Sequence, residues 1–162
     1  MTLTAHAVVG AAIASLIPQH PEIVACAAFA SHFAVDAIPQ WDYSIRSASI
    51  NPGIGAKMRY DRAFFLDICA IGADALLGIV LSLLLFASAQ DWWVILLGAC
   101  AGMLPDPLQF VYAHWRHEPL VSLQRFHHWM HTRIRLKDVP LLGISSQLVF
   151  LVAVVVLTRV LL

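Results

Sequence analysis

A histidine and an aspartate, His32 and Asp36, interrupt an apolar run in the segment SHFAVDAIPQWD at 31–42. Residues four apart share one face of a helix, so these two side chains point to the same side. An imidazole and a carboxylate together suit Zn²⁺, Mn²⁺ or Fe²⁺. A hydrogen-bonded pair that neutralises both groups inside a helix bundle is the alternative interpretation. We favour the first and treat His32 and Asp36 as metal ligands.

Two more candidate ligands lie near the ends of apolar segments. His6 lies close to the N-terminus, and Asp106 stands between two prolines in LPDP at 104–107. The prolines break a helix there and bias Asp106 away from the α region. Irregular backbone at membrane depth is tolerated where it lines a cavity or is buried in protein, which favours a ligand. The alternatives are an interfacial residue for His6 and a capping residue at a simple helix end for Asp106.

A histidine-rich segment, FHHWMH at 126–131, supplies the last strong candidates. On a helix, His127 and His131 share the face of the neighbouring apolar residues, whereas Trp129 points away. We expect an amphipathic helix that lies on the membrane surface and brings His127 and His131 over the other candidates. An interfacial helix whose histidines contact only lipid headgroups is the alternative.

Four weaker candidates complete the set: His128, Asp42, Asp67 and Asp74. His128 points to the side of its helix, and Asp42 is a further ligand or a turn residue. Asp67 and Asp74 either orient the ligand histidines from outside the site or balance arginines such as Arg62.

The composition predicts that a membrane surrounds these residues. The 162-residue chain is 60% hydrophobic and only 12% charged, whereas soluble domains are roughly 25% charged. Its length suits one domain. The formal net charge is zero, so no overall field indicates a nucleic-acid partner. Three cysteines, Cys26, Cys69 and Cys100, lie in apolar runs without metal-type spacing, and we expect them to be buried packing residues.

The apolar segments predict an all-α, polytopic membrane helical bundle with about five transmembrane helices and one cytoplasmic interfacial helix. The spans are expected at about 3–17, 22–38, 64–87, 92–112 and 140–162, and the interfacial helix at about 119–131. The first span is short for a bilayer, so we expect neighbouring helices to shield its ends. Gly98 and Gly102 form a GxxxG pattern, which either allows close helix approach or is a chance match.

The basic residues predict the orientation of the bundle. All Lys and Arg residues except Arg159 fall in the two long loops, 39–63 and 113–139. The positive-inside rule places both loops and the N-terminus in the cytoplasm. The candidate ligands of four spans then come to one depth beneath the cytoplasmic surface. Ionisable residues inside spans usually mark function.

These pieces resemble a known family. The fragments TAH at 4–6, SHFAVD at 31–36, LPD at 104–106 and FHHWMH at 126–131 together span most of the chain. They resemble, as a distant branch, the small integral-membrane metal-dependent hydrolases that include the LexA-regulated inner-membrane protein. The resemblance implies a metal-binding membrane protein with hydrolase activity. The His-x-x-x-Asp spacing also looks like part of the zinc sites of bacterial phospholipase C and P1-type nucleases, which favours a phosphoester substrate.

The sequence therefore predicts a metal-dependent hydrolase in the cytoplasmic (inner) membrane that acts on a lipid or phosphoester at the cytoplasmic leaflet. One or two divalent ions, Zn²⁺ first and Mn²⁺ or Fe²⁺ as alternatives, would activate a water. The predicted metal ligands are His6, His32, Asp36, Asp106, His127 and His131, with Asp36 and Asp106 also as catalytic carboxylates. Arginines would hold a phosphate or headgroup, and the candidates are Arg59, Arg62, Arg125 and Arg133.

Two other functions remain open at this point. A proton- or metal-coupled transporter would use the same Asp and His residues as a path, although such a path needs polar groups across the whole membrane depth. A non-catalytic membrane protein that binds metal or haem is the other alternative. The oligomeric state does not follow from the sequence.

Overall fold

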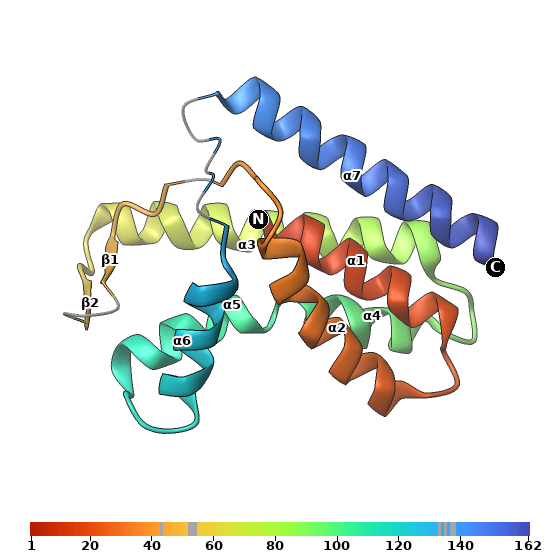
Figure 1. The fold of residues 1–162 in the computed structure, drawn as a ribbon, viewed down its shortest axis with the longest axis horizontal. Coiled ribbons are helices and arrows are strands. Elements are labelled where there is room, and N and C mark those ends of the chain that lie inside the picture. The colour runs from red at the N-terminus through yellow and green to blue at the C-terminus, as the bar shows by residue number, and fades with distance from the viewer. Residues whose placement is uncertain (43, 52–54, 133, 135, 137–138) are drawn as a thin grey trace.

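The computed structural model describes residues 1–42, 44–51, 55–132, 134, 136 and 139–162, and for 48–51 and 55–58 it describes the backbone alone. Within these residues the chain forms seven helices and a short antiparallel hairpin (Figure 1). The helices are α1 Leu3–Leu16, α2 Pro21–Asp36, α3 Arg62–Phe86, α4 Trp92–Met103, α5 Pro105–His114, α6 Leu120–Met130 and α7 Pro140–Leu161. The hairpin strands are β1 Ala48–Asn51 and β2 Gly55–Met58.

The helices occupy the ranges predicted from the sequence, with two differences. The predicted fourth span consists of α4 and α5, which are bent by 48° where they meet at Leu104. The first long loop contains the hairpin, which an all-α prediction did not include. The structure is therefore a helical bundle with one small β element in a connecting segment.

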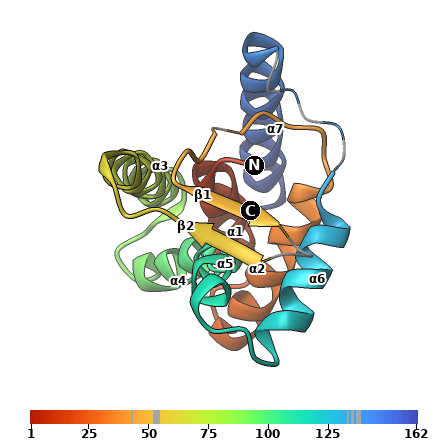
Figure 2. The same cartoon turned by 90° about the vertical axis from the view of Figure 1, so that its left-hand side faces the viewer.

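The first helix, α1, lies at the centre of the bundle. It contacts α2, α3, α4 and α7, and Figure 2 shows these helices arranged around it. The side chains of Ala5, Ala7, Ala11 and Ala14 are fully buried, because alanine lets neighbouring helices approach closely. A helix of 14 residues is only about 21 Å long. The neighbouring helices shield this short, central helix, as the sequence predicted.

The GxxxG pattern lies where α4 packs against α1. A Cβ atom on Gly102 would lie 2.5 Å from the carbonyl oxygen of His6, and one on Gly98 would lie 3.0 Å from the carbonyl carbon of Gly10. Real side chains cannot occupy such positions without a backbone shift. Glycine at these positions therefore permits the contact between the two backbones, and the predicted close approach is confirmed.

Chain direction alternates through the bundle. Figure 1 shows α1, α3 and α7 running one way and α2 and α4 running the other. Both long connecting segments, with the hairpin and with α6, lie at the end where α1 begins. This arrangement brings the end of α2, the start of α5 and the end of α6 close to the first turns of α1.

Two helices in the described residues, α3 and α7, are long and apolar enough to cross a membrane, and a third span exists if α4 and α5 are counted as one. They carry exposed apolar side chains, including Leu84 at 77% and Leu141 at 81%. Such a surface is characteristic of contact with lipid rather than with water. The count of five spans stays a prediction.

The three cysteines are exposed, so the prediction that they are buried packing residues is wrong. Cys26 and Cys100 line an apolar groove between α2 and α4. Apolar sequence around a residue indicates burial only where water is the solvent, whereas here the outer faces of the helices are apolar as well.

Candidate metal centre

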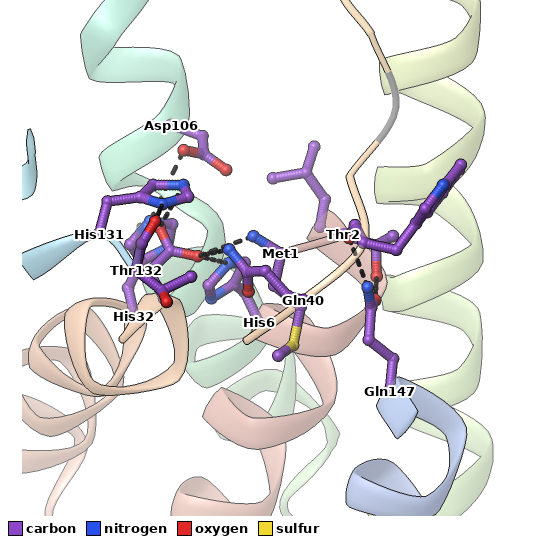
Figure 3. A network of polar contacts seen from close by, with 12 residues as sticks. Met1, Thr2, His6, His32, Gln40, Asp106, His131, Thr132 and Gln147 are labelled. Atoms are coloured by element: carbon purple, nitrogen blue, oxygen red, sulfur yellow. Dashed lines mark hydrogen bonds and ion pairs between the residues drawn. The ribbon is translucent and has the colours of Figure 1, made fainter. Parts of the chain in front are cut away.

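Four side chains that are far apart in the sequence meet at one point beside the first turns of α1. His32 and Asp36 lie on α2, Asp106 lies in the first turn of α5, and His127 lies on α6. Each offers one ligand atom, and these atoms all lie within 4.8 Å of one another. Figure 3 shows His32 and Asp106 at this point, together with His6 and His131. We call His32, Asp36, Asp106 and His127 the four-residue centre, and it could hold a metal ion.

The spacing of the ligand atoms suits a single divalent ion. The Nε2 atoms of His32 and His127 are 3.3 Å apart, and Asp36 Oδ2 lies 3.3 Å from the first and 2.9 Å from the second. Asp106 Oδ1 lies 3.6 Å and 3.9 Å from the same two nitrogens. Corners of a tetrahedron around Zn²⁺, with bonds of about 2.0–2.1 Å, are about 3.3 Å apart. The donor types suit a bound ion, and the separations of the three most buried donors, 2.9–3.3 Å, lie close to this value.

The far side of the His32 ring is fixed by a backbone carbonyl. Its Nδ1–H donates to the carbonyl oxygen of Gly102 over 2.8 Å. Gly102 lies in the last turn of α4, where carbonyl groups lack partners within their own helix. This hydrogen bond places the proton on Nδ1 and leaves the lone pair of Nε2 directed at the centre, as in known metal-binding histidines.

The two oxygens of Asp36 face different groups. Oδ2 faces His127 and His32, and His131 Nε2 lies 4.0 Å away. Oδ1 accepts hydrogen bonds from the Met1 α-ammonium group at 2.7 Å and from Gln40 Nε2 at 3.1 Å. Asp36 therefore contacts the histidines of the four-residue centre with one oxygen and the Met1 and Gln40 groups with the other.

No arginine or lysine pairs with the carboxylates of the centre among the side chains that the structure describes. Arg59, Arg62 and Arg125 are exposed, and Arg59 pairs with Asp61 at 2.9 Å. Arg133 lies outside the described residues. The buried carboxylate of Asp36, which is 1% exposed, has the Met1 α-ammonium group at 2.7 Å as its compensating charge. The predicted phosphate-binding role of these arginines stays a prediction.

His6 and His131 lie beside the four-residue centre. The buried ring of His6 stacks on the ring of His32 with 3.8 Å between centroids, and its Nε2 is 3.2 Å from Asp36 Oδ1. The side chain of His131 is 22% exposed and lies at the rim. The structure thus brings all six predicted metal ligands to one place.

Contacts between α6 and the end of α2 position His127. The rings of Phe33 and Phe126 meet edge to face with 4.9 Å between centroids, and Phe33 also contacts His127. Immediately after α6, the N–H of Thr132 donates to the carbonyl oxygen of Asp36 over 2.9 Å. Aromatic packing and a backbone hydrogen bond therefore hold the end of α6 against the centre.

Asp106 differs from its prediction. Pro105 begins α5, and Asp106 lies in the first helical turn rather than in irregular backbone. The first helical turn tolerates prolines because its N–H groups have no partner within the helix. The break comes before Asp106, and the bend points its side chain at the centre.

Two weaker candidates, Asp67 and Asp74, bind backbone elsewhere. Asp74 accepts hydrogen bonds from the N–H groups of Leu3 at 2.7 Å and Thr4 at 3.2 Å. It therefore caps the start of α1, which carries His6. Asp67 accepts from the N–H groups of Arg46 at 2.9 Å and Ser47 at 2.8 Å. In these contacts the carboxylates fix backbone instead of orienting ligand histidines.

The remaining weak candidates lie outside the four-residue centre. His128 is exposed on α6, and Asp42 is partly buried in the segment after α2. The sequence reasoning missed Gln40 and the Met1 α-amino group, both of which bind Asp36. The sequence signal that could have identified Gln40 is its position four residues beyond Asp36.

Comparisons with known proteins identify no relative: no family model matches the chain, and neither a curated protein nor a solved structure is significantly similar to it.

Proposed function

We propose that the protein is a membrane-embedded metal-dependent hydrolase that acts on a lipid or phosphoester substrate. The observation that supports it is the convergence of two imidazoles and two carboxylates within 4.8 Å, with solvent reaching part of the group. The side chain of Asp106 is 30% exposed, whereas those of His32 and Asp36 are almost completely buried. A site with buried ligands and one open side suits catalysis better than purely structural metal binding.

Zn²⁺ is the ion we propose first, and Mn²⁺ or Fe²⁺ also suit a mixed set of imidazole and carboxylate donors. His32, Asp36 and His127 would hold it, and Asp106 would face the water that completes its coordination. A divalent ion at this position would activate a water for hydrolysis at neutral pH.

The side chains of the centre then have distinct roles. His32 and Asp36 are ligands because both are buried and oriented by hydrogen bonds on their outer sides. Asp106 is the more accessible carboxylate, and Gln109 Nε2 donates to its Oδ1 over 2.9 Å. We assign to Asp106 the acceptance of a proton from the attacking water. His131, at the rim, is placed to contact the substrate.

An apolar groove supports a lipid as the substrate. It has a volume of about 510 Å³ and lies between α2 and α4, with Cys26 and Phe29 on one wall and Cys100 and Leu104 on the other. Phe29 is one turn from His32, and Leu104 is two residues from Asp106. An acyl chain in this groove would have its ester or phosphoester end beside the centre.

We also propose the membrane placement that the basic residues indicate. The protein would lie in the cytoplasmic membrane with its N-terminus and both long connecting segments in the cytoplasm. The four-residue centre would then open toward the cytoplasmic leaflet.

Metal analysis and hydrolysis assays test this function. The protein is purified in mild detergent, supplied with Zn²⁺ or Mn²⁺, and assayed for bound metal and for hydrolysis of phospholipids and small phosphoesters. His127→Ala should lower metal affinity by at least about tenfold and abolish hydrolysis, because one ligand is lost. His128→Ala, next to it but exposed, is the matched control and should change neither. A wild-type protein that binds far less than one ion per chain would contradict the proposal.

A substitution that fills the groove tests whether the groove binds the acyl chain of the substrate. Cys26→Trp should slow hydrolysis of long-chain substrates and leave short-chain substrates unaffected, because only a long chain needs the groove. Cys69→Trp, on the exposed face of α3, is the control. Equal effects on both chain lengths would exclude the groove as the acyl site.

A further inference from the structure

The oxygen of Asp36 that faces away from the four-residue centre has a separate set of neighbours. Oδ1 lies 3.2 Å from His6 Nε2, 3.1 Å from the Gln40 amide nitrogen and 2.7 Å from the Met1 α-ammonium group. All three of these residues lie on the same side of the site in Figure 3. The Met1 group is a positive charge, so a divalent ion on this side would take its place at Oδ1.

Three buried polar atoms on this side, from two residues, have no hydrogen-bond partner of the usual geometry. Neither ring nitrogen of His6, which is 1% exposed, makes a hydrogen bond, and the Gln40 side-chain oxygen makes none either. Buried polar groups are nearly always satisfied, because an unsatisfied one costs free energy. An imidazole nitrogen and an amide oxygen are both metal ligands, so a bound cation would satisfy His6 Nε2 and the Gln40 oxygen.

The stacking of the His6 ring on the His32 ring indicates how far apart two bound ions would lie. Its plane is nearly parallel to that of His32, at 19°, with the ring centroids 3.8 Å apart. In two-metal hydrolytic sites the ions are about 3.5–4 Å apart. Two stacked imidazoles, each facing one oxygen of the same carboxylate, match that separation.

We propose that the site binds two divalent cations with Asp36 as the bridging ligand. The first ion lies in the four-residue centre on the Oδ2 side. The second lies on the Oδ1 side, held by His6 Nε2 and by the Gln40 amide oxygen once that amide rotates toward it. This inference rests on the proposed metal centre and adds a second ion to it.

Titration with Mn²⁺ alone tests the second position. The full chain, with its affinity tag at the C-terminus so that the residues around Met1 are unchanged, is titrated in detergent while bound metal and the electron paramagnetic resonance spectrum are recorded. We expect two equivalents and a spin-coupled spectrum for the wild type. His6→Ala should retain one equivalent with an uncoupled spectrum, and Asp36→Ala should lose both. His128→Ala is the control and should bind two.

The outcomes separate the second ion from the first. One equivalent in the wild type, unchanged in His6→Ala, would overturn the second position and leave the four-residue centre intact. No bound Mn²⁺ or Zn²⁺ in the wild type would overturn both. Because His6 is buried and its truncation leaves a cavity, His6→Phe, which keeps the ring stack without a ligand atom, is made in parallel. Two equivalents in folded His6→Phe would also overturn the proposal.

Discussion

At the scale of single residues, two side chains of the four-residue centre are each held by a contact on the edge that faces away from it. The Gly102 carbonyl holds His32 and Gln40 holds Asp36 in this way, whereas Gln109 binds Oδ1 of Asp106, the oxygen that faces the two imidazoles. A side chain fixed on its outer edge loses little rotamer freedom when it binds an ion. The geometry for metal binding is therefore present before the ion arrives.

Asp106→Asn separates binding from catalysis. Asparagine keeps an oxygen atom and the size of the side chain but cannot accept a proton. We expect hydrolysis to fall by about 10²–10⁴-fold, while bound metal falls much less. The measurement is the hydrolysis rate together with metal content on the same sample. Glu22→Gln, an exposed carboxylate with a side chain 71% exposed, is the control, and unchanged hydrolysis in Asp106→Asn would reject its assigned role.

At the scale of secondary-structure elements, the site depends on a short helix at the centre and on a bend. α1 can carry His6 into the interior because α2, α3, α4 and α7 surround it and Asp74 caps its start. The 48° bend between α4 and α5 turns Asp106 toward α2. Prolines begin α2, α5 and α7, which fixes where each helix starts without removing a helical hydrogen bond.

Gly102→Ala tests the contact between α1 and α4. The added Cβ would lie 2.5 Å from the His6 carbonyl oxygen, so the two backbones must separate. We expect a loss of about 1–3 kcal/mol in the free energy of unfolding and weaker metal binding, because the Gly102 carbonyl also holds His32. Thermal unfolding in detergent measures the first effect. Gly72→Ala is the matched control: nothing lies within 4 Å of its added Cβ, so stability should be unchanged or slightly higher. Equal thermal stability of Gly102→Ala and Gly72→Ala would show that the close contact between α1 and α4 is not needed for stability.

At the scale of the whole molecule, the long apolar helices and the polar site have different positions. Many exposed apolar side chains lie along α3 and α7, and both long connecting segments lie at the end where α1 begins, as the four-residue centre does. α1, α3 and α7 run opposite to α2 and α4, as a chain that crosses a membrane repeatedly must. The proposed orientation follows from this arrangement and from the basic residues in the long segments.

Site-directed labelling tests that orientation. In a chain whose three cysteines are replaced by alanine, a single cysteine is introduced at Ser88, between α3 and α4, or at Arg116, between α5 and α6. A membrane-impermeant maleimide should label the Ser88 position in intact cells and the Arg116 position only in inside-out vesicles. The control for non-specific labelling is the same cysteine-free chain with alanine instead of cysteine at position 88 or 116. Labelling of both positions from one side would contradict the topology, and recovery in the soluble fraction would contradict membrane insertion.

The sequence by itself determined the helices and one half of the site. Helix positions follow from local signals, namely apolar runs that end at proline or polar residues, and these signals act within a few residues. His32 and Asp36 share a face because helix geometry alone sets their spacing. The segments carrying His6, Asp106 and His127 were also identified, because ionisable residues are rare in apolar sequence.

Only the tertiary structure decided how those segments meet. The cap that Asp74 provides to α1, the Gly102 carbonyl behind His32 and the two-sided environment of Asp36 all join residues from different helices. The burial of His6 and the exposure of the three cysteines likewise depend on which faces of the helices pack together. Sequence patterns report which residues share a face of one helix, but packing between helices fixes which faces touch, and the contacts of Asp36 exist only through that packing.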